Sequence, residues 1–191
     1  ERSRGLGDVY KRQVHNITNF VVMNHSANVL LSMGASPVMA HSLREVQDMV
    51  SLASALVLNI GTLEPKWIKA MIKAGKNAKC PIILDPVGSG ATPYRTETSK
   101  LLLNKLKITV LRGNASEILS LVSEKATTKG VDSVHSVDDA IDIAKSIAKE
   151  YNGMIVAVSG KDDFITDGIN SYKCSNGHPL MPLVTGLGCG L

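Results

Sequence analysis

The chain has 191 residues, of which 44% are hydrophobic and 20% are charged, so it is long enough for one sizeable core and too apolar for a disordered protein. Its 21 lysines and arginines against 17 aspartates and glutamates leave a net charge of +4, and no basic stripe with interleaved aromatic residues occurs. We therefore expect no nucleic-acid partner. No apolar run approaches the length of about 20 residues that crosses a bilayer, so we expect no membrane partner either.

The use of cysteine and histidine also excludes some classes of site. The three cysteines, at positions 80, 174 and 189, form no Cys-x-x-Cys pair, and the five histidines have no metal-ligand spacing. This pattern argues against a structural zinc site and indicates a reducing compartment. Because the N-terminus also lacks the apolar core of a signal peptide, we expect a cytoplasmic protein.

Residues 1–13 differ in character from the rest of the chain. They show neither a helical nor an alternating apolar pattern, and we interpret them as a non-native or adapter-derived segment. Residues 14–191 contain no repeat, low-complexity tract or long linker, so we expect them to form a single domain.

From Val14 onward, short apolar runs alternate with longer segments of helical period, which is typical of a mostly parallel sheet covered by helices. In chain order the pattern predicts a helix over 21–33, an extended piece over 34–41, a helix over 43–54, a strand over 55–60, a helix over 65–79, a strand over 82–84, a helix over 95–106, a strand over 108–111, helices over 115–122 and 137–151, and a strand over 154–158. Residues 162–173 predict a hairpin around Asp167-Gly168, a turn pair that tolerates positive φ. The expected fold class is therefore α/β with a small antiparallel addition.

Polar residues and glycines follow four of the predicted strands. These segments are 59–62, 85–88, 112–114 and 159–160. Because open α/β sheets bind ligands at the carboxyl ends of their strands, we expect one crevice there. Asp85 leaves its strand through a proline and two glycines, so we expect its side chain to be exposed at that crevice.

Two carboxylates and one arginine at these strand ends are suited to phosphoryl transfer. Asp85 and Glu117 are candidate carboxylates for Mg²⁺, Glu117 through water, and Arg112 is a candidate contact for nucleotide phosphate. A structural explanation remains open, because Asn114 and Glu117 have the spacing of a helix capping box. For Asp85 the corresponding explanation is a turn-forming aspartate.

The chain ends on the glycine-spaced segment 184–191, which has the pattern of a helix start that holds an anion. Cys189 would lie beside a bound phosphoryl group, where its thiolate could accept a proton from an attacking alcohol. The alternative is a glycine-rich turn that contains a small buried residue.

Together these segments resemble the hydroxyethylthiazole kinase family, a ribokinase-like family. The motifs that carry the resemblance run from Val14 to the last residue and are Ile17-Thr18-Asn19, Ala27-Asn28, Gly34 to Ala40, Ala55 to Leu63, Leu84 to Gly88, Gly90 to Pro93, Arg112 to Ala115, Asn176-Gly177-His178 and Val184-Thr185-Gly186. The resemblance implies a ribokinase-like three-layer α/β/α domain over 14–191, truncated at its C-terminus because family members continue through further helices. It also implies ATP-dependent phosphorylation of 4-methyl-5-(2-hydroxyethyl)thiazole in thiamine salvage.

The resemblance assigns roles to matching positions. Asn19, Val21, Met39 and Gly186 would contact the thiazole, and Arg112 and Ser159 would contact ATP. Asp85 and Glu117 would serve the Mg²⁺–phosphate region, and Cys189 stands where relatives in the wider superfamily carry an aspartate base. The family implies a homotrimer with thiazole sites at the subunit boundaries.

Two other functions remain open at this stage. One is a related ribokinase-like kinase for the pyrimidine half of thiamine or another vitamin alcohol. The other is a chain that binds ligand without catalysis, since Leu187 places bulk between two glycines where the family has a small residue. No Gly-x-Gly-x-x-Gly motif follows the first strand and no Gly-x4-Gly-Lys-Ser/Thr motif occurs, which argues against a dinucleotide dehydrogenase and a P-loop protein. A cysteine hydrolase would have only His178 as a partner for Cys189.

Overall fold

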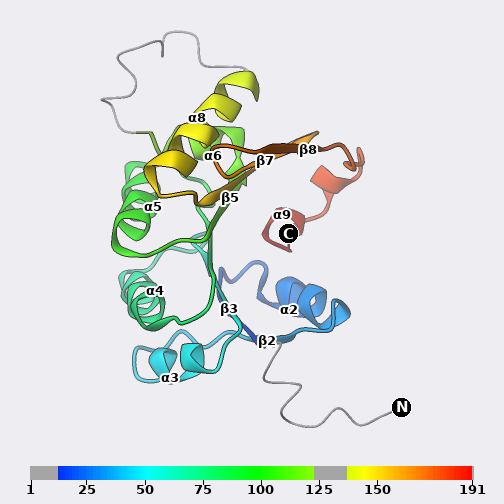
Figure 1. Cartoon of the computed structure of the whole chain (residues 1–191). Helices are drawn as coiled ribbons and strands as arrows, with labels where there is room; N and C mark the ends of the chain where they lie inside the picture. The colour runs from blue at the N-terminus through cyan, green and yellow to red at the C-terminus, as the bar shows by residue number, and fades with distance from the viewer. Residues whose placement is uncertain (1–12, 123–136, 191) are drawn as a thin grey trace.

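A computed structural model describes residues 13–122 and 137–190, and it organises them around one twisted sheet (Figure 1). The described strands are β1 (Gln13–Ile17), β2 (Ser36–Val38), β3 (Ala55–Asn59), β4 (Ile82–Asp85), β5 (Val110–Asn114), β6 (Ile155–Ser159), β7 (Asp163–Thr166) and β8 (Ser171–Cys174). Their order in the sheet is β2-β1-β3-β4-β5-β6-β7-β8. All pairs from β2 to β6 are parallel, while β6, β7 and β8 pair antiparallel. The mostly parallel sheet and the predicted hairpin are confirmed.

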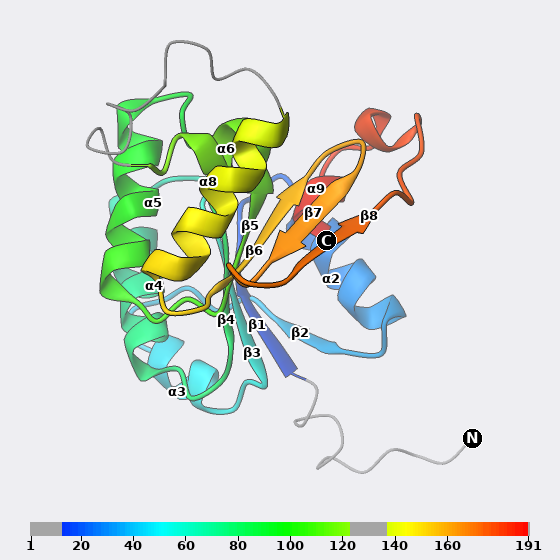
Figure 2. The same cartoon turned by 45° about the horizontal axis from the view of Figure 1, so that its top comes forward.

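Helices cover the two faces of the sheet unequally, as Figures 1 and 2 show. One face carries α3 (Val46–Ser51), α4 (Pro65–Asn77), α5 (Pro93–Lys105), α6 (Ala115–Leu119) and α8 (Val137–Glu150). The other face carries α2 (Met23–Ser32) and α9 (Leu187–Gly190), which follows the short 3₁₀ turn η2 (Met181–Leu183). The three-layer arrangement expected from the sequence is thus present in the described residues.

Local sequence explains where the longer helices begin. α4 and α5 each start with a proline at the first turn, where the missing N–H costs no hydrogen bond. Thr92 also caps α5, because its side chain accepts a hydrogen bond from the backbone N–H of Arg95 at 3.3 Å. α4 then buries Ala70, Met71 and Ala74 in the core beneath the sheet, while Trp67 packs against the rings of Phe20 and His41.

The hydrophobic core lies between the sheet and the α4–α5–α8 layer. Alternate strand residues such as Leu56, Leu84 and Leu111 are fully buried on this face and pack against helix residues such as Met71. Burying each such side chain contributes about 1.5–3 kcal/mol. The intervening residues point to the opposite face, so strand alternation fixes which side chains reach α2 and α9.

Strand β1 is the element that the sequence analysis did not predict. Its centre carries His15 and Asn16, both of which are buried. His15 Nε2 lies 2.6 Å from the carbonyl oxygen of Ala40, and burial lowers the pKa of this imidazole. Gln13, which the sequence analysis placed in the excluded segment, is the first residue of β1 and pairs in register with Ser36; the rest of that segment lies outside the described residues.

Smaller differences concern the ends of elements. β5 begins two residues later than predicted and continues to Asn114, so Arg112 lies within the strand. The helix predicted over 43–54 is limited to α3. No helix within the described residues combines the length and apolar character needed to cross a membrane.

Candidate active site

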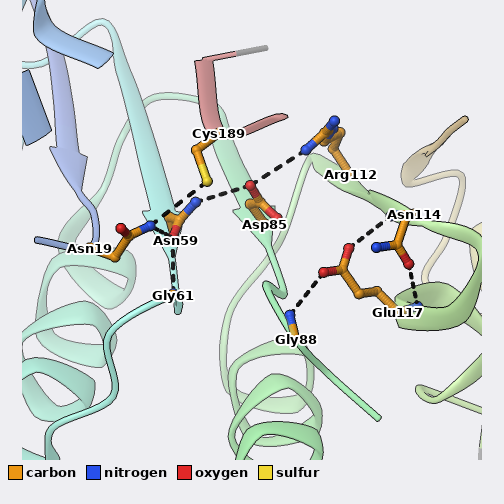
Figure 3. Close-up of polar contacts among 9 residues, drawn as sticks. All are labelled: Asn19, Asn59, Gly61, Asp85, Gly88, Arg112, Asn114, Glu117 and Cys189. Atoms are coloured by element: carbon orange, nitrogen blue, oxygen red, sulfur yellow. Dashed lines mark hydrogen bonds and ion pairs between the residues drawn. The ribbon is translucent and has the colours of Figure 1, made fainter. Parts of the chain in front are cut away.

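The site lies at the carboxyl edge of the sheet, at its topological switch point. The chain passes from β1 outward to β2 and returns on the other side of β1 as β3, which opens a crevice between the two connections. Asn19 follows β1 and Asn59 ends β3. The Asn19 Nδ2 group donates to Asn59 Oδ1 at 2.8 Å, so a buried hydrogen bond spans the switch point (Figure 3).

Asp85 is the last residue of β4 and pairs in register with Asn59. Asn59 Nδ2 donates to Asp85 Oδ2 at 3.0 Å, and a guanidinium nitrogen of Arg112 lies 3.6 Å from the same oxygen. The residue is only 6% exposed, so the expectation of an exposed aspartate was wrong. The reason is that Asp85 still belongs to the strand, and its neighbours on both sides cover it.

Burial dominates the electrostatics of this carboxylate. Desolvation raises the pKa of Asp85 to about 7; the Arg112 cation opposes the shift, the Glu117 charge adds to it, and the hydrogen bond from Asn59 opposes it. Without ligands, therefore, the site contains two acidic groups that repel each other beside one cation. A bound cation would relieve this repulsion.

Glu117 combines two backbone contacts at the start of α6. Its Oε2 accepts the N–H of Asn114 at 2.8 Å, while Asn114 Oδ1 accepts the N–H of Glu117 at 2.9 Å, which confirms the capping box. Its Oε1 accepts the N–H of Gly88 at 2.8 Å, which ties the loop after β4 to α6 (Figure 3). Glu117 is thus a structural residue whatever its role toward a metal.

The donor set fits a magnesium ion that is shared with a nucleotide. In the described part of the chain, no group of three or more His, Cys, Asp or Glu side chains forms a metal site of its own. Mg²⁺ usually takes one or two carboxylates and completes its shell with water and phosphate oxygens. Asp85 is suited to contact the ion directly, because both contacts described for its carboxylate use Oδ2 and neither uses Oδ1. Glu117, with both oxygens bonded to backbone, fits a contact through water.

Cys189 lies in α9 and faces the same cluster. Its Sγ is 3.8 Å from Asn19 Nδ2, the amide nitrogen that also donates to Asn59 (Figure 3). A Cβ added to neighbouring Gly188 would be 3.5 Å from a guanidinium nitrogen of Arg112. The segment that carries the thiol therefore also borders the cation.

The turn before α9 requires glycine at position 186. Gly186 has φ +79°, a left-handed conformation that L residues rarely adopt, and an added Cβ would overlap Val22 of the α2 start. This turn brings α9 against α2 and places Cys189 over the carboxyl edge.

A cavity of about 480 Å³ opens on the α2–α9 face of the sheet. Its lining includes Asp85, Arg112, Ser159 and Cys189 together with alternate apolar residues of the strands. The structure thus brings Asp85, Arg112, Ser159 and Cys189 to one crevice, whereas Glu117, the other predicted metal residue, is not among the residues that line it. Ser159 ends β6 and pairs with Asn114 in register.

Two residues predicted to contact the thiazole, Val21 and Met39, are not among the residues that line this cavity. Val21 is 73% exposed, and its backbone N–H donates to Asn19 Oδ1 at 3.1 Å. Met39 is half-buried just beyond the end of edge strand β2, and no described hydrogen bond or ion pair joins its side chain to Asp85 or Cys189.

Arg95 is a positioning residue that the sequence analysis did not identify. Its guanidinium donates to the carbonyl oxygens of Ile60 at 3.0 Å, Gly61 at 2.9 Å and Val87 at 2.8 Å. It therefore clamps the loops that follow β3 and β4, which carry Asn59 and Asp85. An arginine in the first turn of a helix gives no sequence signal for such a contact.

We expect Arg95→Lys to destabilise the fold, because an ammonium group cannot span three carbonyl groups on two loops. The expected loss is about 2 kcal/mol in the free energy of unfolding, or about 4–8 °C in melting temperature for a domain of this size. Thermal unfolding followed by circular dichroism measures it. Arg44→Lys, at an exposed position, is the matched control, and an equal loss in both variants would contradict the clamp.

Comparison with known proteins places the chain in a family. Residues 10–191 match the model of the hydroxyethylthiazole kinase family. Among similar proteins, the hydroxyethylthiazole kinase of Desulfotalea psychrophila is 56% identical over 94% of this chain and 66% of its own length. The structure of a hydroxyethylthiazole kinase protein from Pyrococcus horikoshii OT3 is 44% identical, with a TM-score of 0.84 over 94% of this chain and 68% of that one.

More distant structures share only the fold. A ribokinase-like superfamily protein from Enterococcus faecalis V583 is 11% identical and superposes with a TM-score of 0.67 over 98% of this chain and 70% of that one. The chain spans about two thirds of the length of the curated relatives that it matches. Because the family model matches residues 10–191 and curated relatives are 52–56% identical, this chain belongs to the hydroxyethylthiazole kinase family.

Proposed function

We propose that the protein catalyses the ATP-dependent phosphorylation of 4-methyl-5-(2-hydroxyethyl)thiazole on its hydroxyl group, a step of thiamine salvage. The observation that carries this proposal is the convergence of Asp85, Arg112, Ser159 and Cys189 on one cavity at the carboxyl edge of the sheet. Family membership supports the choice of a kinase and of this alcohol.

Each residue has a task that its position supports. Arg112 binds the phosphate of ATP and stabilises the charge that develops during transfer, with Ser159 as a second contact to the nucleotide. Cys189 accepts the proton of the attacking alcohol, and Asn19 Nδ2 donates a hydrogen bond to its sulfur. Asp85 and Glu117 hold Mg²⁺, which neutralises phosphate charge when bound.

The thiazole itself lies between Asn19, Val21, Met39 and Gly186 in this proposal. Val21 is exposed and Met39 is half-buried, so a second subunit has room to complete the acceptor side of the site, where the thiazole alcohol binds. We therefore propose a homotrimer with thiazole sites at subunit boundaries, acting in the cytoplasm.

A coupled ADP-release assay tests this function on the protein expressed as its gene encodes it. We expect ADP release to depend on the thiazole alcohol, and a hydroxymethylpyrimidine to be a much poorer acceptor. Preference for the pyrimidine would instead favour the related vitamin kinase. Calorimetric binding of the thiazole alcohol without phosphorylated product would favour a binding protein.

We expect Cys189→Ser to lower kcat by about 100-fold, since a positioned general base typically contributes this much or more. Cys174→Ser is the matched control, because Cys174 is an exposed thiol on β8. An unchanged kcat in Cys189→Ser, or an equal loss in both variants, would remove the base role.

A further inference from the structure

Asn59 is the central residue of the hydrogen-bond network at the switch point. The residue is only 2% exposed, and three hydrogen bonds use its side chain. Its Oδ1 accepts from Asn19 Nδ2 at 2.8 Å and from the backbone N–H of Gly61 at 2.9 Å, while its Nδ2 donates to Asp85 Oδ2 at 3.0 Å. The Asn59 side chain thus joins Asn19, on the acceptor side proposed for the thiazole alcohol, to Asp85, on the side proposed for phosphate and metal.

Backbone groups fix the orientation of both amides. A backbone N–H can only donate, so the contact with Gly61 requires the oxygen of the Asn59 amide on that side and directs its Nδ2 to Asp85. In the same way, the N–H of Val21 holds Asn19 Oδ1, which directs Asn19 Nδ2 to Asn59 and to the sulfur of Cys189. The hydrogen bonds of this network are therefore donated in one direction, from Asn19 to Asn59 and from Asn59 to Asp85.

We propose that Asn59 is a positioning residue that holds the Asp85 carboxylate and the Asn19 amide in one fixed arrangement, and so aligns the acceptor side with the phosphate side. This inference rests on the proposed kinase function. It assigns Asn59 no contact with substrate; the residue acts through Asp85 toward phosphate and metal, and through Asn19 toward Cys189.

Asn59→Asp removes one link selectively. The aspartate retains an oxygen for Asn19 and Gly61, but it places a second oxygen against Asp85 Oδ2, where the parent has a donor. We expect kcat to fall by about 10-fold to 100-fold, as is usual when a partner that orients a ligating carboxylate is lost, with the KM for the thiazole alcohol unchanged. Because a smaller folded fraction would also lower the apparent kcat without changing KM, kcat is calculated per folded protein, with the folded fraction measured by circular dichroism. A defect of folding alone would leave this corrected kcat unchanged.

Gly61→Ala disturbs the opposite end of the network, at the Asn19 side chain. A Cβ at this position would lie 2.7 Å from Asn19 Cγ, so the Asn19 side chain must move away from Asn59 and Cys189. The contact between Asn59 and Asp85 involves neither group. We expect this variant to affect Cys189 more strongly than Asn59→Asp does.

The alkylation rate of Cys189 provides a readout that requires no turnover. Iodoacetamide labelling with peptide mass spectrometry separates Cys189 from Cys80 and Cys174. The alkylation rate reports the immediate surroundings of the sulfur, so we expect loss of the N–H donated by Asn19 in Gly61→Ala to change alkylation of Cys189 by about threefold to tenfold. Labelling of Cys174 should not change.

The exposed residue Asn77, at the end of α4, gives the matched control, since Asn77→Asp adds the same charge away from the site. The proposal is supported if Asn59→Asp lowers kcat and Gly61→Ala changes the rate of Cys189 alkylation while Asn77→Asp does neither. It is overturned if Asn59→Asp keeps its kcat, if Asn77→Asp loses as much, or if Gly61→Ala leaves the labelling rate unchanged. An inactive parent would refute the proposed function, whereas the labelling experiment would still decide whether the network reaches Cys189.

Discussion

Asp85→Asn is expected to lower kcat by about 100-fold to 1,000-fold, because it removes a charge that is positioned for the metal and the transferred phosphate. The substituted amide can still accept from Asn59, so the local packing around Leu84 and Asn59 is retained. Steady-state kinetics with saturating ATP and thiazole alcohol measure the effect. Retention of more than half of the parent kcat would contradict a role for this carboxylate in phosphoryl transfer.

The same substitution should change the dependence of stability on pH. Burial raises the pKa of Asp85 from its usual 3.8 to about 7, so the folded protein binds a proton that the unfolded chain releases between these values. This contribution to stability is present below about pH 4 and is lost as the pH rises through about 7. We expect the ligand-free parent to lose stability between about pH 4 and about pH 7 relative to Asp85→Asn. Parallel melting-temperature profiles for the two proteins would contradict the raised pKa.

Glu117→Gln should impair both folding stability and catalysis. Each carboxylate oxygen accepts a backbone N–H, from Gly88 and from Asn114, and a glutamine can supply only one oxygen. One N–H would lose its acceptor, at a cost of about 1–3 kcal/mol in the free energy of unfolding. If Glu117 also serves the metal, we expect kcat to fall by about 10-fold to 100-fold. Urea unfolding and ADP release measure the two effects separately.

Asn114→Ala separates the effect of helix capping from the effect of the Glu117 carboxylate. This variant removes the side chain that accepts the N–H of Glu117 but keeps both backbone contacts of the Glu117 carboxylate. We expect a loss of about 1 kcal/mol in stability and little change in kcat. If Asn114→Ala reduced kcat as strongly as Glu117→Gln, the catalytic effect of Glu117 would be explained by helix capping alone.

Much of the fold was predictable because its signals are local. Apolar runs and helical periods identified the strands from β3 to β6 and the helices that cover them, and the pair Asp167-Gly168 identified the β7–β8 hairpin. β1 was missed because His15 and Asn16 interrupt its apolar character. Their burial depends on the neighbouring strands β2 and β3, which a local pattern does not contain.

The site was predictable in part for the same reason. Asp85, Arg112 and Ser159 were identified because polar residues follow apolar runs, and the parallel sheet brings such ends to one edge. The burial of Asp85 and the role of Arg95 depend on contacts between separate loops. Asn59 was visible as a polar strand end, but only the β3–β4 register places it opposite Asp85.

The most direct test of the account is a crystal structure of the protein, expressed as its gene encodes it, with a non-hydrolysable ATP analogue, Mg²⁺ and the thiazole alcohol. The account predicts that the terminal phosphate contacts Arg112, that the metal lies on the Asp85 side of it, and that the alcohol oxygen is within hydrogen-bonding distance of Cys189 Sγ. Nucleotide bound at another edge of the sheet, or an alcohol whose oxygen points away from both the phosphate and Cys189, would contradict it.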